Sequence, residues 1–159
     1  MKTLLRCLLL GATLLATCAV AAPAARPQLT ITTLDGQTFN LAAQRGKWVI
    51  VNYWATWCSP CIKEMPDLSA YVAAHANVTA IGLAWDEIER SELDEFVRKH
   101  PVVYPLAQVD TDHPPADFPT PRGLPVTYLI APDGSLAKTF TGPVDGKDLA
   151  AVIEAAKAQ

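Results

Sequence analysis

The sequence predicts an α/β domain in which a central mixed β-sheet is flanked by helices on both faces and preceded by a β-hairpin. Two apolar runs, residues 48–54 and 78–85, enclose a segment whose apolar side chains have helical spacing. A strand, a crossover helix and a second apolar strand form a right-handed unit with parallel strands. Near the C-terminus, residues 126–130 and 135–141 flank a Pro-Asp-Gly turn, which predicts an antiparallel pair. Parallel and antiparallel pairs together predict a mixed sheet.

The first 21 residues have the pattern of a secretory signal peptide. Lys2 and Arg6 give a basic start, an apolar stretch follows, and Ala-Val-Ala ends the segment as a small-x-small cleavage site. We expect cleavage after Ala21. An uncleaved anchor is one alternative, although the apolar run is short for a membrane span. Lipidation at Cys18 is another, because Leu-Ala-Thr-Cys has the outline of a lipobox.

The rest of the chain is predicted to be a linker over 22–28 and one domain over 29–159. Half of all residues are hydrophobic, which is enough for a core at this length. Loss of Lys2 and Arg6 would leave 11 basic residues against 16 acids, so the net charge would change from −3 to −5. An acidic domain argues against nucleic acid as a partner, and we expect a monomer.

The domain begins with a hairpin pattern. Residues 29–33 alternate between apolar and polar, Asp35 and Gly36 form a turn, and residues 38–41 return. The run 48–54 is apolar on both faces, as a central strand requires.

A helix is predicted over 60–74, with Pro66 inside it as the source of a kink. After the strand 78–85 comes an acidic run, 86–95, which we interpret as a solvated helix face, with a docking face for a partner as the alternative. Ser91 is the expected cap of that helix, which ends near residue 99.

The C-terminal third contains a strand over 104–109 and then a segment, 110–122, that holds four prolines and cannot be a regular helix. This segment is either a stiff connector or a determinant of partner choice. A strand over 126–130, its antiparallel partner over 135–141 and a helix over 146–158 complete the domain.

The motif that carries chemistry is Trp57-Cys58-Ser59-Pro60-Cys61, at the point where an apolar strand meets a helix. Unpaired backbone N–H groups and the helix dipole stabilise a thiolate at a helix N-terminus. Cys58 is therefore expected to be the reactive nucleophile. Cys61 lies one helical turn on, where it can resolve a mixed disulfide.

Two alternatives for the cysteines are weaker. A closed zinc site needs four ligands, and the sequence offers neither a second CxxC nor clustered histidines. We therefore expect no metal and no cofactor. A structural disulfide across three residues would remove little chain entropy.

The text from Val51 to Cys61, then Glu64-Met65-Pro66 and later Gly123-Leu124-Pro125 before an apolar strand, resembles the thioredoxin superfamily. The resemblance is greatest to the exported TlpA/ResA/CcmG-like thiol-disulfide oxidoreductases. It implies a thioredoxin-like fold, to which the hairpin is an addition shared with the ResA-like branch. That family usually has a short helix where this chain has the proline-rich segment 110–122.

Further site residues follow from spacing and from this resemblance. Glu64 lies one turn below Cys61, where a partly buried carboxylate could relay a proton; the alternative is an exposed helical glutamate. Asn52 replaces the buried aspartate of thioredoxin itself. Pro125 is expected to follow a cis peptide bond, and Leu124 to contact an extended peptide substrate, with Trp57 covering the site.

The predicted function is thiol–disulfide exchange, with the protein acting as a reductant of exported proteins in the periplasm. The resemblance implies roles such as preparation for haem attachment or metal-centre assembly, with electrons from a membrane thiol donor. Two alternatives stay open. One is a peroxidase of the peroxiredoxin group, with Thr56 assisting Cys58. The other is a copper chaperone that uses Cys58, Cys61 and Met65.

Overall fold

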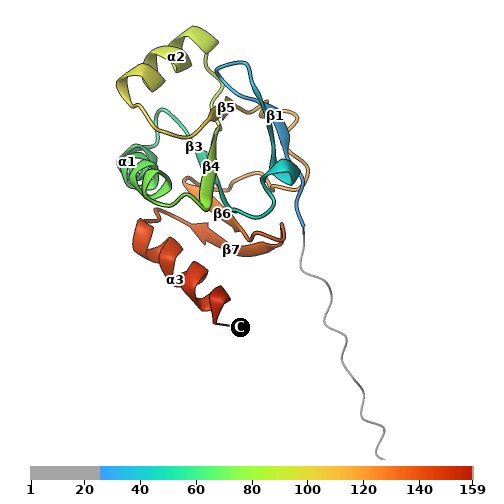
Figure 1. Ribbon diagram of the computed structural model, residues 1–159. Coiled ribbons are helices and arrows are strands. Elements are labelled where there is room, and N and C mark those ends of the chain that lie inside the picture. The colour runs from blue at the N-terminus through green and yellow to red at the C-terminus, as the bar shows by residue number, and fades with distance from the viewer. Residues whose placement is uncertain (1–25, 159) are drawn as a thin grey trace, which may run out of the picture.

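A five-stranded mixed sheet forms the centre of the domain in the computed structural model, which describes residues 26–158. The predicted signal peptide lies outside these residues. The strands are β3 (Trp48–Trp54), β4 (Val78–Ala84), β5 (Leu106–Gln108), β6 (Val126–Ile130) and β7 (Leu136–Thr141). Their order is β5-β4-β3-β6-β7 (Figure 1). The pairs of β3 with β4 and of β4 with β5 are parallel, whereas β6 is antiparallel to both of its neighbours. The predicted mixed sheet is confirmed.

The predicted hairpin forms a separate two-stranded sheet of β1 (Thr30–Thr32) and β2 (Thr38–Asn40). Gly36 has a φ of 80° in the connecting turn, a conformation that glycine adopts without strain. The N–H of Leu34 donates to the carbonyl of Leu106 at 2.7 Å. This bond attaches the hairpin to the outermost strand of the central sheet.

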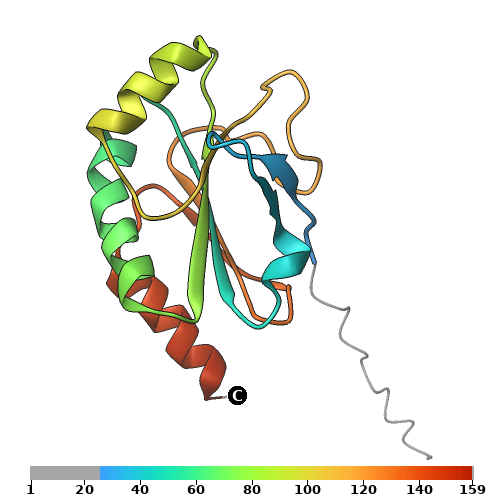
Figure 2. The same ribbon diagram turned by 45° about the horizontal axis from the view of Figure 1, so that its top comes forward.

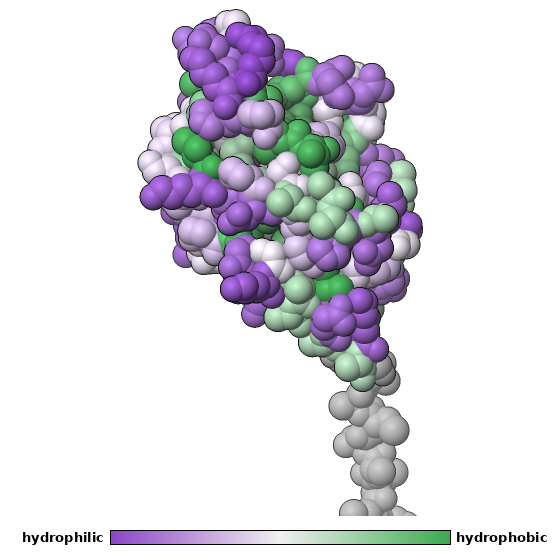
Figure 3. Space-filling model, turned by 60° about the vertical axis from the view of Figure 1, so that its left-hand side comes forward, coloured by the Kyte–Doolittle hydropathy of each residue, from purple (hydrophilic) through white to green (hydrophobic). Residues whose placement is uncertain are grey.

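The α-helices of the described chain all pack on one face of the sheet (Figure 2). They are α1 (Ser59–Ala74), α2 (Arg90–Lys99) and α3 (Gly146–Lys157). The core beneath them joins alternate residues of β3 to one side of each helix, through Ile50, Leu68, Leu93 and Leu149 among others. Hydrophilic residues gather over α2 at the top of Figure 3, as its amphipathic sequence requires.

The opposite face of the sheet is covered mainly by chain without α-helical structure. The hairpin, the short 3-10 helix η1 (Leu41–Gln44) and the proline-rich segment 110–122 pack there. Phe118 anchors that segment and is only 1% exposed. Helices on both faces were predicted, but η1 is the helical element of the described chain on this second face. Four prolines in segment 110–122 remove the N–H groups that a helix would need.

Two local predictions around α2 are wrong. The helix begins at Arg90 and its N-cap is Glu89, whose carbonyl accepts from the N–H groups of Glu92 and Leu93. Ser91 therefore lies within the first turn and does not cap it. Asp86 precedes the helix and is buried, with 5% exposed, so it is not part of a solvated helix face. The helix α1 continues through Pro66 without interruption.

No helix within residues 26–158 is both long and apolar enough to cross a membrane.

Candidate active site

Cys58 is the N-cap residue of α1, four residues after the end of β3. Its extended backbone, with φ of −88°, turns the chain from the sheet into the helix. Its Sγ accepts a hydrogen bond of 3.3 Å from the N–H of Cys61. Pro60 occupies the first turn, where a missing N–H costs no helical hydrogen bond. The sequence therefore places the sulfur of Cys58 at the positive end of the helix dipole.

The two cysteines form a disulfide, with an S–S distance of 2.00 Å. Cys58 is 4% exposed and Cys61 is fully buried. An incoming sulfur atom therefore has access to Cys58 and none to Cys61.

The three predicted substrate-contacting residues differ in their exposure. Trp57 directly precedes the nucleophile and is 67% exposed. Leu124 is half-buried and packs against the same core cluster as the two cysteines. Pro125 is buried, and the Leu124–Pro125 peptide bond is cis, the geometry expected from the sequence. An exposed indole and a half-buried leucine thus leave apolar surface available near the disulfide.

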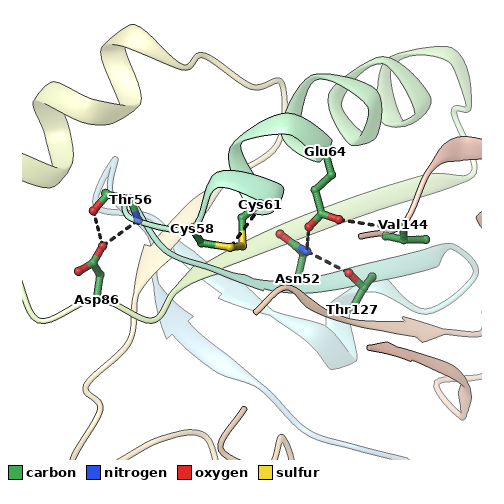
Figure 4. The surroundings of a disulfide bond; sticks show 8 residues. All are labelled: Asn52, Thr56, Cys58, Cys61, Glu64, Asp86, Thr127 and Val144. Carbon is green, nitrogen blue, oxygen red and sulfur yellow. Dashed lines mark hydrogen bonds between the residues drawn. A yellow bond between two sulfur atoms is a disulfide. The ribbon is translucent and has the colours of Figure 1, made fainter. Parts of the chain in front are cut away.

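Glu64 is a buried carboxyl group next to the disulfide (Figure 4). One oxygen, Oε1, accepts from Nδ2 of Asn52 at 2.8 Å, and the other accepts from the N–H of Val144 at 2.9 Å. Burial raises the pKa of Glu64 from 4.5 to about 7, and these two hydrogen bonds offset part of that rise. Glu64 can therefore gain or lose a proton near neutral pH, which an exposed glutamate could not do.

Asn52 connects Glu64 to the other half of the sheet. Its Nδ2 donates to Glu64 and also to the hydroxyl of Thr127 on β6, at 2.9 Å. Asn52 and Thr127 are directly paired across β3 and β6. The amide group therefore holds the carboxylate against the sheet, beneath α1.

A groove of about 320 Å³ lies between α1 and the segment that connects β7 to α3. Glu64 is among its lining residues, together with the charged side chains of Lys63, Asp67, Asp145 and Asp148. This groove provides a route by which the carboxyl group can exchange a proton with water.

A second buried carboxylate, Asp86, was not identified as a site residue from the sequence. Its Oδ2 accepts from the backbone N–H of Thr56 at 2.8 Å and from the hydroxyl of Thr56 at 2.6 Å. Thr56 lies two residues before Cys58, so Asp86 fixes the loop that delivers the nucleophile. Its position directly after an apolar parallel strand was the available signal, because strand ends of this kind carry site residues.

Two observations concern the peroxidase and copper-chaperone alternatives. In the peroxidase alternative Thr56 assists Cys58, but the hydroxyl of Thr56 is directed to Asp86. In the copper-chaperone alternative Met65 is a ligand, but its side chain is only 1% exposed. Within residues 26–158, no group of three or more His, Cys, Asp or Glu side chains is placed to hold a metal ion.

Comparisons with known proteins agree with this arrangement. The sequence pattern of the AhpC/TSA family matches residues 22–139. The thiol-disulfide oxidoreductase ResA of Geobacillus thermodenitrificans is 27% identical over 87% of this chain and 80% of its own length. The ResA of Bacillus cereus is 31% identical over 73% of this chain and 67% of its own.

Among solved structures, a secreted disulfide oxidoreductase of Mycobacterium tuberculosis, described as homologous to E. coli DsbE, superposes with a TM-score of 0.68. It is 27% identical, with 82% of this chain and 97% of that chain covered. The chain therefore belongs to the AhpC/TSA family and is a thiol-disulfide oxidoreductase with a thioredoxin-like fold, related to the ResA proteins.

Proposed function

We propose that this protein reduces disulfide bonds in exported proteins, with Cys58 as the nucleophile, Cys61 as the resolving thiol and Glu64 as the proton carrier. The observation that carries the proposal is the buried carboxyl group of Glu64, one helical turn below a Cys pair at a helix N-terminus. Its pKa of about 7 allows it to act as an acid or a base at neutral pH.

The exchange proceeds in two steps. The thiolate of Cys58 attacks one sulfur of the substrate disulfide, forms a mixed disulfide and releases the first substrate thiolate. Cys61 then gives its proton to Glu64, and its sulfur attacks Sγ of Cys58 and releases the second thiolate. Two electrons pass from the enzyme dithiol to the substrate. Glu64 returns its proton to solvent or to the departing thiolate.

The direction of transfer follows from how strongly the thiolate is stabilised. Strong oxidants hold their thiolate at a pKa of about 3.5, against about 7 in thioredoxin. Here Ser59 and Pro60 bring no positive charge, and an ionised Glu64 repels a thiolate beside it. A weakly stabilised thiolate makes the dithiol a reductant.

The proposed location is the periplasm. The signal-peptide pattern of residues 1–21 supports it, as does the relative described as secreted. A reductant in an oxidising compartment must be recharged, so we propose a membrane thiol donor as its partner. Preparation of cysteines for haem attachment or for metal-centre assembly is the proposed use.

An extended peptide is the proposed substrate form. Trp57 offers an exposed indole next to Cys58, and the backbone around Leu124 and Pro125 lies beside the same core cluster. A peptide strand could pair with that backbone while an apolar side chain contacts Leu124.

The equilibrium with glutathione tests the direction. A reduction potential at or below about −200 mV is expected, and a value near the −120 mV of a strong oxidant would overturn the assignment. Expression of the Cys61→Ser variant in the source cell should trap exported proteins as mixed disulfides on Cys58. The matched Cys58→Ser variant should trap none.

A further inference from the structure

The side-chain amide of Asn52 has a hydrogen-bonding group without a partner. Asn52 is 1% exposed, and both hydrogens of its Nδ2 are used, by Glu64 and by Thr127. Its Oδ1 is fully buried and accepts no hydrogen bond. A buried acceptor without a donor costs about 1–3 kcal/mol, so such an atom in an otherwise bonded network calls for a reason.

The neighbours fix the orientation of this amide. Nδ2 donates to Glu64 and to Thr127, which is the only orientation compatible with an ionised carboxylate, so Oδ1 faces away from Glu64. Figure 4 shows that Oδ1 is turned toward the disulfide, on the opposite side of the amide from Glu64 and Thr127. In the disulfide neither sulfur carries a hydrogen, so neither can donate to this oxygen.

We propose that Oδ1 of Asn52 accepts a hydrogen bond from the thiol of Cys61 once the disulfide is reduced. Reduction by an incoming dithiol breaks the S–S bond and adds two electrons and two protons, one of which stays on Sγ of Cys61. The acceptor that is unpaired in the oxidised protein then gains its donor. Asn52 is thus a positioning residue: its Nδ2 holds the carboxylate of Glu64 while its Oδ1 holds the thiol proton of Cys61 until that proton is transferred, and this role rests on the proposed function of Glu64.

Other groups in the same core cluster must be considered as donors. The hydroxyl of Tyr104 and Nε1 of Trp54 are buried and also lack partners, and neither forms a hydrogen bond with Asn52. The titratable groups around the site are Cys58 and Glu64 on α1 and Tyr104 from the segment before β5. Burial raises the pKa of Tyr104 and Glu64 raises it further, so this hydroxyl remains protonated at neutral pH.

The S–H stretching band of Cys61 in the reduced full-length chain tests the proposal. In a Cys58→Ser background, this band is identified as the one that the additional Cys61→Ser change removes. We expect it at a lower frequency than in free cysteine, because an accepted hydrogen bond weakens the S–H bond. A band at the free-cysteine frequency overturns the proposal without further variants.

The matched variants separate the oxygen from the rest of the network. Asn52→Leu should move the band to the free-thiol frequency, whereas Thr127→Val and Tyr104→Phe should leave it in place. Asn52→Asp, which keeps an acceptor oxygen, should retain the lowered band. An equal shift in Thr127→Val and Asn52→Leu would show that loosening of the network is sufficient, and would overturn the proposal.

The redox equilibrium supplies a second measure. A bond present only in the reduced state favours that state, so Asn52→Leu should shift the equilibrium with glutathione about fivefold toward the disulfide. No such shift is expected in Thr127→Val, and an unshifted Asn52→Leu would count against the proposal. A lowered S–H band combined with an unchanged pH profile in Glu64→Gln would support the Asn52 bond while removing Glu64 from the proposed function.

Discussion

The backbone N–H of Val144 donates a hydrogen bond of 2.9 Å to Oε2 of Glu64, although 80 residues separate them along the chain. Val144 lies just before α3, and Glu64 lies in α1. A single carboxyl group therefore belongs both to the redox site and to the contact between the two helices. Its protonation should affect the stability of the fold as well as the chemistry.

Stability should depend on pH through Glu64. The pKa of Glu64 is about 7 in the folded protein against 4.5 ordinarily, so the folded state binds the proton more tightly than the unfolded state. This contribution is fully present below pH 4.5 and is lost as the pH rises to about 7. The unfolding free energy of the oxidised protein should therefore fall by about 3 kcal/mol across this range.

Glu64→Gln should remove that slope, since glutamine does not titrate. The amide of glutamine also places an NH₂ group near the donors of Asn52 and Val144, which changes the absolute stability of the variant. The quantity to compare is therefore the pH dependence of the unfolding free energy, measured by urea unfolding at a series of pH values. The same variant should flatten the pH profile of disulfide exchange near pH 7. Equal slopes in both proteins would mean that Glu64 titrates as an exposed residue does.

Cys58 should be alkylated before Cys61 in the reduced protein. The exposed fraction favours Cys58, and the helix N-terminus should lower its pKa below the free value of about 8.5. The rate of alkylation at each cysteine, followed across pH by mass spectrometry of its peptide, measures this. Faster labelling of Cys61 would exchange the roles of the two thiols.

Trp57→Ala should weaken the use of peptide substrates and leave the fold unchanged. With 67% of the side chain exposed, its removal should alter the unfolding free energy by no more than about 0.5 kcal/mol. Loss of an exposed aromatic anchor from a contact surface weakens binding, so we expect the KM for a peptide disulfide to rise about tenfold. Reduction of a small disulfide should keep its rate.

Val103→Ala is the matched control for Trp57, because Val103 is 63% exposed and apolar but lies outside the site. Val103→Ala should change neither the KM for the peptide disulfide nor the rate at which the small disulfide is reduced. A similar rise in KM for both variants would point to general surface hydrophobicity in place of a docking residue.

Asp86→Ala should destabilise the loop that precedes Cys58. It removes the acceptor of two hydrogen bonds from Thr56 and leaves a backbone N–H without its partner. We expect a loss of about 2–3 kcal/mol in unfolding free energy, measured in urea. Thr56→Val removes only the hydroxyl bond and should cost about 1 kcal/mol. Equal losses would show that the N–H bond contributes nothing.

The sequence was sufficient for features that depend on local periodicity and composition. The strands β3 and β6 have the predicted bounds, and α1 begins one residue before its predicted start. The burial of Glu64 followed from its spacing to Cys61 within one helix. Each of these expectations needed only neighbouring residues.

Features that depend on contacts between distant segments could not be predicted. The bonds of Glu64 to Asn52 and Val144 depend on how α1 lies across the sheet. The charge of Asp86 matches that of the acidic residues after it and so predicts a place on the same helix face, whereas Asp86 is buried and hydrogen-bonded to Thr56 on another segment. The location of α1, α2 and α3 on one face likewise depends on which face the hairpin and segment 110–122 cover.

That hairpin constrains the order in which the chain can fold. Leu29 and Phe39 belong to the same core cluster as Tyr128 and Ile130, about ninety residues later. A chain that emerges N-terminus first therefore cannot complete the burial of its first hydrophobic residues until β6 has been made. Contacts of such long sequence separation slow folding. The earliest segment of the domain is therefore among the last to gain its full set of core contacts.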